Sequence, residues 1–196
     1  MLKKKNTAER VIALVDEMRE NSQEMRMWKN IPLAEECVSI LRSLKDETPL
    51  GKAMACNAIC EQLPEYDVPR FVLTILSYER ELLEQSDEES GDNGPTLEEV
   101  DQDIRRLTDY IDVQNVSVEA FMERYSRHLK FDPVERTPQW EEVYYKAEQE
   151  CDRLLGDTPR GMGFCFSHWS TFRHVLAKRG IQWRSPSEMN PRVMFD

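Results

Sequence analysis

Apolar residues recur at every third or fourth position along most of this chain, the spacing of one face of an α-helix. The clearest case is the segment 97–111. Its apolar residues begin with Leu97, Val100 and Ile104 and keep this spacing, and charged or polar residues lie between them. The same pattern predicts helices over 7–28, 32–45, 49–63, 69–83, 97–111, 118–129, 138–155 and 167–179. We therefore predict an all-α fold with about eight helices, arranged as a compact helical bundle or as two packed helical lobes.

Local start and stop signals support several of these helices. Thr96 and Glu99 form the pattern of a capping box, in which side-chain oxygens accept from the first free N–H groups of a helix. Thr137 followed by Pro138 is typical of a helix start, because proline is tolerated in the first turn. Gly156 suits the residue just after a helix, since glycine adopts a left-handed conformation without strain.

An acidic stretch divides the predicted helices into two groups. The sequence QSDEESGDNGP, residues 85–95, has four acidic residues and no large apolar side chain, the composition of a solvated loop. We predict an N-terminal helical lobe over 1–85, an acidic loop or linker over 86–95, and a C-terminal helical lobe over 96–196 with a basic, aromatic-rich end.

The charge of the chain limits its partners. With 26 basic and 37 acidic residues, the net charge of −11 repels phosphate backbones and anionic membranes. Nucleic acid is therefore disfavoured as a partner, and no uncharged apolar run reaches the roughly 18 to 20 residues that cross a bilayer. Seven glycines are too few for a glycine-rich nucleotide loop or a turn-dense β-sandwich.

The cysteines and the first residues indicate the compartment. Asp16 and Glu17 interrupt the apolar stretch that follows the basic start, so the pattern of an export signal is not met. Five cysteines, an odd number, then favour reduced thiols over a disulfide framework. We expect a cytoplasmic protein.

The C-terminal end differs in charge from the rest of the chain. Residues 160–196 carry a net charge of +4, whereas residues 1–159 carry −15. Tryptophan and arginine dominate the energetics of protein interfaces, and this end holds both. Our candidate partner contacts are Trp183, Arg184, Trp169 and Arg173.

The two tryptophans have an alternative role in the core of the C-terminal lobe. For Trp169, flanked by Phe166 and Phe172, we favour that role, so Trp183 is the better test of an interface.

The turn before the last long helix is a candidate anion site. Arg160, Gly161, Gly163, Ser167 and His168 could surround a phosphate or carboxylate with backbone N–H groups and basic side chains. The turn lacks the preceding strand and the Lys-Ser/Thr of a phosphate-binding loop, and a tight turn between packed helices explains the glycines equally well.

Three residues of the same region have side chains that could bind a metal or supply the nucleophile and base of a thiol enzyme. Cys165, His168 and His174 carry ligand-type side chains, but the histidines are six residues apart and no fourth ligand is near. No family signature surrounds Cys165 as a nucleophile. We expect no metal, cofactor or catalytic residue.

These observations favour a non-enzymatic interaction or adaptor protein over an enzyme. We expect its C-terminal segment to bind a protein partner or a second copy of the chain. The alternative is an enzyme or a domain that binds a small anionic ligand at the Gly161–Ser167 turn.

Overall fold

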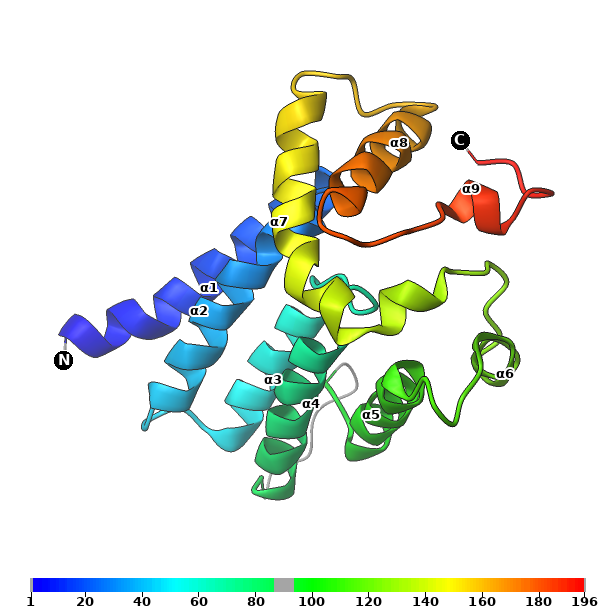
Figure 1. Ribbon diagram of the computed structural model, residues 1–196. Coiled ribbons are helices and arrows are strands. Elements are labelled where there is room, and N and C mark those ends of the chain that lie inside the picture. Colours follow the sequence, from blue (N-terminus) through cyan, green and yellow to red (C-terminus); the bar gives the residue numbers. More distant parts are fainter. Residues whose placement is uncertain (1, 87–93, 196) are drawn as a thin grey trace. The chain divides into compact units, whose positions relative to one another are not determined.

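The computed structural model describes residues 2–86 and 94–195, and for residues 2–7 the backbone alone (Figure 1). Within these ranges it holds nine α-helices, eight of them with seven residues or more, and no strand. The all-α prediction is confirmed. In the described part of the chain, none of the helices combines the length and apolarity needed to cross a membrane.

The chain divides into two compact units, which we name unit 1, Met1–Thr108, and unit 2, Asp109–Asp196. The helices, with two short 3-10 turns η1 and η2, are α1 (Leu2–Gln23), η1 (Met27–Lys29), α2 (Asn30–Ser43), α3 (Pro49–Cys60), α4 (Pro69–Glu84), α5 (Leu97–Ile111), α6 (Val118–Arg124), η2 (Pro133–Arg136), α7 (Pro138–Leu155), α8 (Phe164–Ala177) and α9 (Pro186–Met189).

The division between the units falls inside α5. Residues 87–93 of the predicted acidic linker lie outside the described residues, so the predicted boundary at 86–95 stays a prediction.

Unit 1 is built on two helix pairs. α3 and α4 lie side by side, and α1 packs along α2 (Figure 1). The apolar stripe of α1 is buried as its spacing predicts, with Leu14 and Met18 fully buried. Small residues on α3, among them Ala53 and Cys56, are buried as well, which lets its neighbour come close.

A buried asparagine ties three parts of unit 1 together. The side-chain amide of Asn30, at the start of α2, donates to the carbonyl oxygen of Met18 at 3.0 Å and to that of Gln62 at 2.7 Å. Its own oxygen accepts from the amide of Asn21 at 3.0 Å. These bonds join α1, α2 and the turn that follows α3, and they satisfy a polar side chain that is inaccessible to water.

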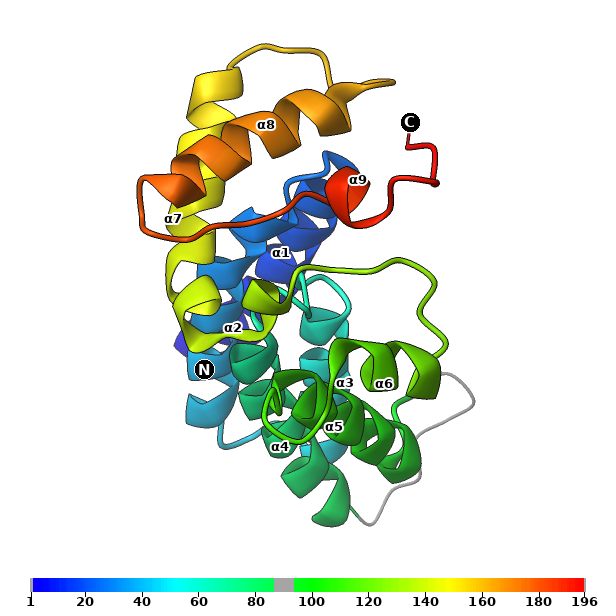
Figure 2. The same ribbon diagram turned by 45° about the vertical axis from the view of Figure 1, so that its right-hand side comes forward.

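Unit 2 is organised around α7 and α8, which pack against each other (Figure 2). Its core is aromatic: Trp140 on α7 meets Phe172 on α8 with ring centroids 5.8 Å apart and nearly perpendicular planes. Arg136, in η2, is buried, and its guanidinium donates to main-chain carbonyls at the end of α5, including those of Asp109 at 3.0 Å and Asp112 at 3.2 Å. A cation there complements the negative end of the helix dipole.

Several predicted helix boundaries differ from the structure by two to five residues, most clearly in α1, α6 and α8. α1 ends at Gln23 rather than near Trp28, because the chain turns at Met25, whose φ is +56°. α6 ends at Arg124, before Ser126 with φ +50°, so the predicted continuation toward Leu129 is wrong. α8 begins earlier than expected, at Phe164.

Candidate functional site

Three residues of the C-terminal segment, Trp183, Arg184 and Asn190, bind it to the rest of unit 2 by hydrogen bonds. The indole N–H of Trp183 donates to Glu135 Oε1 at 2.7 Å. The backbone N–H and the Nε of Arg184 both donate to Asp132 Oδ2, at 2.9 and 3.0 Å. The side chain of Asn190 bonds the main chain of Lys130 in both directions. The segment that follows α8 is therefore an integral part of unit 2.

Trp183 belongs to the core of this unit. It is 7% exposed, and its ring lies 5.4 Å from that of Phe172 and 6.0 Å from that of Trp140. The core role that we favoured for Trp169 is thus taken by Trp183, whose indole N–H is satisfied inside the molecule.

The carboxyl group that receives this indole bond lies in a poorly hydrated position. Burial raises the pKa of Glu135 to about 7, while the bonds from Trp183 and from the backbone of Asp132 oppose the rise. Both donors favour the ionised form. The contact between Glu135 and Trp183 is therefore part of the packing of unit 2 and is sensitive to pH.

Two of the predicted partner contacts, Arg184 and Arg173, form ion pairs within unit 2. Arg184 pairs with Asp132 as described above, and Arg173 pairs with Glu188 of α9 at 2.6 Å. Glu188 also accepts from the backbone N–H of Ser185 at 2.8 Å, which with Arg173 lowers the pKa of Glu188. Both guanidinium groups stay about half exposed, so they can still meet a partner.

Trp169 is half-buried and belongs to a ladder of aromatic rings. Phe166 and Trp169 meet edge to face with centroids 5.6 Å apart, and Trp169 meets Phe195 in the same way at 5.1 Å. Phe166 is 49% exposed. The ladder joins the first half of α8 to the C-terminal tail, and it leaves aromatic surface in contact with water.

Two methionines that are close to the ladder residues in the sequence are almost fully exposed. Met162, in the turn before α8, is 93% exposed, and Met194, next to Phe195, is 95% exposed. We name these five residues, Met162, Phe166, Trp169, Met194 and Phe195, the C-terminal aromatic patch. Exposed large apolar side chains are candidates for contact with a partner.

The predicted anion turn is held by intramolecular pairs. Arg160 pairs with Asp152 of α7, and its guanidinium lies 4.8 Å from the ring centroid of Phe164. His168 Nε2 lies 3.0 Å from a carboxylate oxygen of Glu148, with the imidazole stacked on Phe172. The two basic groups of the turn thus each face a carboxylate.

The other residues of the predicted anion turn shape its backbone or are exposed to water. Gly163 has φ +79° and precedes the first residue of α8, a conformation that favours glycine, and Gly161 and Ser167 are exposed. The structure gathers these residues in one turn but aims no cluster of basic groups at a shared anion.

The metal candidates do not converge. Among residues 2–86 and 94–195, no group of three or more His, Cys, Asp or Glu side chains is arranged to hold a metal ion. His168 faces Glu148, His174 is exposed in the last turn of α8, and Cys165 is half-buried. The structure does not bring Cys165, His168 and His174 together.

The buried thiols behave as small core residues. Burial raises the pKa of Cys37 to about 11 and those of Cys56 and Cys151 to about 12. A thiol with such a pKa is protonated at neutral pH and is a poor nucleophile or metal ligand.

Sequence reasoning missed two features of unit 1. Glu79 is 0% exposed on the inner face of α4, a position that its spacing from Ile75 and Leu82 could have revealed. Arg42 and Tyr78 come from different helices and meet across a hollow, which no spacing along the chain predicts.

Comparisons of the chain with protein-family models, with curated proteins and with solved structures find no match.

Proposed function

We propose that this chain is a non-enzymatic interaction protein that binds an acidic, amphipathic segment of a partner protein through the C-terminal aromatic patch. One observation carries the proposal: Phe166 is 49% exposed in a ladder with the half-buried rings of Trp169 and Phe195, and Met162 and Met194, which are near these rings in the chain, are almost fully in water. The five cysteines, all outside disulfides, suit a reducing compartment such as the cytoplasm.

The side chains of the patch are suited to binding. Tryptophan and phenylalanine bury large areas for a small loss of side-chain freedom, and they are frequent at the centres of interfaces. Methionine is flexible and adapts to different apolar partners. Covering this patch on binding would be favourable, since each Å² of apolar surface removed from water contributes about 25 cal/mol.

The charge around the patch favours an acidic partner over a second copy. The segment 160–196 carries +4, and Arg192, close to Met194 in the chain, is exposed and forms no ion pair among the described residues. Most other arginines of this segment are paired with carboxylates of unit 2, but a two-fold dimer through the tail would bring the two Arg192 side chains toward each other, which is unfavourable. A helix with apolar side chains on one face and carboxylates beside them complements both the apolar surface of the patch and the positive charge near it.

The test uses the four tryptophans as reporters. Each gives one indole N–H signal in a proton–nitrogen correlation spectrum, and single Trp→Phe variants assign the signals. The probe is a synthetic helical peptide with leucines three and four residues apart and glutamates elsewhere. A matched peptide has glutamine in place of every glutamate. We expect a saturable shift of the Trp169 signal with the acidic peptide, and a weaker effect with the neutral one.

Two variants separate the patch from the general surface. Phe166→Ser should weaken binding of the acidic peptide about tenfold, the effect of losing one central aromatic contact. Leu129→Ser, a similar change at another exposed apolar residue of unit 2, should leave the affinity within about twofold. Circular dichroism confirms that both variants keep their helicity.

Three results would overturn the proposal. They are an unshifted Trp169 signal at saturating peptide, equal losses in the two variants, and a dimer in sedimentation experiments that Phe166→Ser abolishes. The last result would assign the patch to a second copy of the chain.

A further inference from the structure

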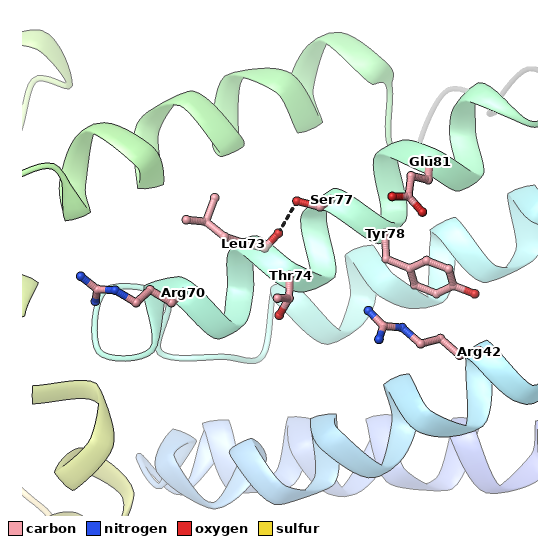
Figure 3. A pocket seen from close by; sticks show the side chains of 7 residues that line it. All are labelled: Arg42, Arg70, Leu73, Thr74, Ser77, Tyr78 and Glu81. Carbon is pink, nitrogen blue, oxygen red and sulfur yellow. Dashed lines mark hydrogen bonds between the residues drawn. The ribbon is translucent and has the colours of Figure 1, made fainter. Parts of the chain in front are cut away.

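A hollow of about 520 Å³ lies along one side of unit 1 between α2 and α4 (Figure 3). It is lined by Arg42, Arg70, Leu73, Thr74, Ser77, Tyr78 and Glu81. All but the first of these residues come from α4, and Arg42 reaches across from α2. The hollow belongs to unit 1 and shares no residue with the C-terminal aromatic patch, so it stands apart from the proposed function.

Arg42 is held in place without a carboxylate partner. Its guanidinium lies 5.2 Å from the ring centroid of Tyr78, which orders the side chain through a cation–π contact. Among the residues that the structure describes, Arg42 forms no hydrogen bond and no ion pair. The chain has 37 acidic residues, and at least ten of its arginines form ion pairs in the described regions, so an ordered arginine whose donors stay available is a distinguishing feature.

Hydroxyl groups line the same space. Thr74 Oγ1 donates to the carbonyl of Phe71, and Ser77 Oγ donates to that of Leu73 at 2.7 Å (Figure 3). Both residues are exposed. A hydroxyl can rotate its hydrogen from a carbonyl of its own helix toward an incoming oxygen. Thr74 faces the space that Arg42 enters, so a guanidinium and a hydroxyl can meet one ligand there (Figure 3).

The two ends of the hollow differ in charge. Arg70 lies toward one end and Glu81 toward the other, with Arg42 and Thr74 between them (Figure 3). An anion held by Arg42 and Thr74 therefore gains from the Arg70 end and is kept away from the Glu81 end. Leu73 and the ring of Tyr78 add apolar surface against which an organic group can pack.

We infer that this hollow binds a phosphate group, either as the free ion or as the ester of a small molecule. A tetrahedral oxyanion can accept from the two-pronged guanidinium of Arg42 and from the Thr74 hydroxyl at the same time, with different oxygens. Exposure of the site to water makes the binding weak, and the ester gains affinity from contact with Leu73 and Tyr78.

The experiment titrates the full chain with sodium phosphate, with phenyl phosphate, and with sodium chloride at matched ionic strength. Backbone amide signals of α4 report binding in proton–nitrogen correlation spectra. We expect saturable shifts confined to the residues around the hollow with both phosphates and none with chloride. Tighter binding of phenyl phosphate identifies an ester as the ligand, and equal affinity identifies the free ion.

Matched variants decide whether the hollow is the site. Arg42→Gln should weaken binding of either phosphate about tenfold, because a charge-assisted contact is lost. Thr74→Val keeps the size of the side chain and should weaken it severalfold. Arg105→Gln is the control, since Arg105 is another exposed arginine of unit 1 that forms no ion pair in the described regions. It should leave the affinity unchanged.

Three outcomes would refute the inference. They are shifts that grow linearly without saturation, the same affinity in Arg42→Gln as in the original chain, and an equal loss in Arg105→Gln. Circular dichroism shows whether each variant is folded. If Arg42→Gln does not fold, Arg42→Lys takes its place, since it keeps the charge but removes the two-pronged geometry.

Discussion

The buried carboxyl group of Glu79 should make unit 1 less stable as the pH rises. Glu79 is 0% exposed, and neither of its oxygens has a hydrogen-bond partner among the described residues. It acts electrostatically on the thiols of Cys56 and Cys60 on α3, and the carboxylates of Asp103 and Glu61 act on it in the same way. Burial raises the pKa of Glu79 from 4.5 to about 8, and the two carboxylates add to this rise.

The sign and size of the effect follow from linkage. The folded chain holds the Glu79 proton more tightly than the unfolded chain, so the free energy of unfolding falls as the pH rises from about 4.5 to about 8. A tenfold difference in proton affinity corresponds to about 1.4 kcal/mol, which gives a total loss of about 5 kcal/mol across this window and about 3 kcal/mol by pH 7. Below pH 4.5 both states are protonated and this loss is absent.

Two substitutions separate the charge from the shape. Glu79→Gln keeps the size of the side chain and removes the titration, so it should be close to the original chain near pH 5 and exceed its stability by about 4 kcal/mol at pH 8. Glu79→Leu also removes the unsatisfied polar atoms and should be at least as stable as Glu79→Gln at both pH values.

The assay is urea unfolding followed by circular dichroism at several pH values from 5 to 8.5. Glu81→Gln is the control, because Glu81 is exposed on the same helix and its change should not alter the pH dependence. If the difference between Glu79→Gln and the original chain is the same at pH 5 and pH 8, the carboxyl group does not titrate in this window and the reasoning fails.

Two other contacts yield predictions for the same assay. Asn30→Ala should lower the free energy of unfolding by about 2 to 3 kcal/mol, because it removes the hydrogen bonds of this buried amide to the carbonyls of Met18 and Gln62, and unchanged stability would contradict the role of this amide. Trp183→Phe keeps an aromatic ring, although a smaller one, and removes the donor to Glu135, so the pKa of that carboxyl should rise above about 7. The loss of stability should be about 1 to 2 kcal/mol at pH 8 and smaller at pH 5, and an equal loss at both pH values would count against the contact.

The sequence by itself determined the fold class and the best-defined helices. The structure begins α5 at Leu97 and α7 at Pro138, where the sequence predicts, and α7 ends just before Gly156. The Thr96 hydroxyl accepts from the backbone N–H of Glu99 at 3.2 Å, as a capping box requires. These features depend on residues within a few positions of one another, so the local sequence contains the information that decides them.

The tertiary structure decided which side chains of the candidate site are available. Trp169 and Trp183 look alike in the sequence, yet Trp183 is buried against Trp140 while Trp169 is only half-buried, in contact with the exposed ring of Phe166. The ion pair of Arg184 with Asp132 spans 52 positions along the chain.

The charge state of Glu79 and the hollow at Arg42 likewise depend on neighbours from other helices. Burial and pairing are properties of contacts between segments that are distant along the chain, and the spacing of residues within one helix does not specify which of those contacts form.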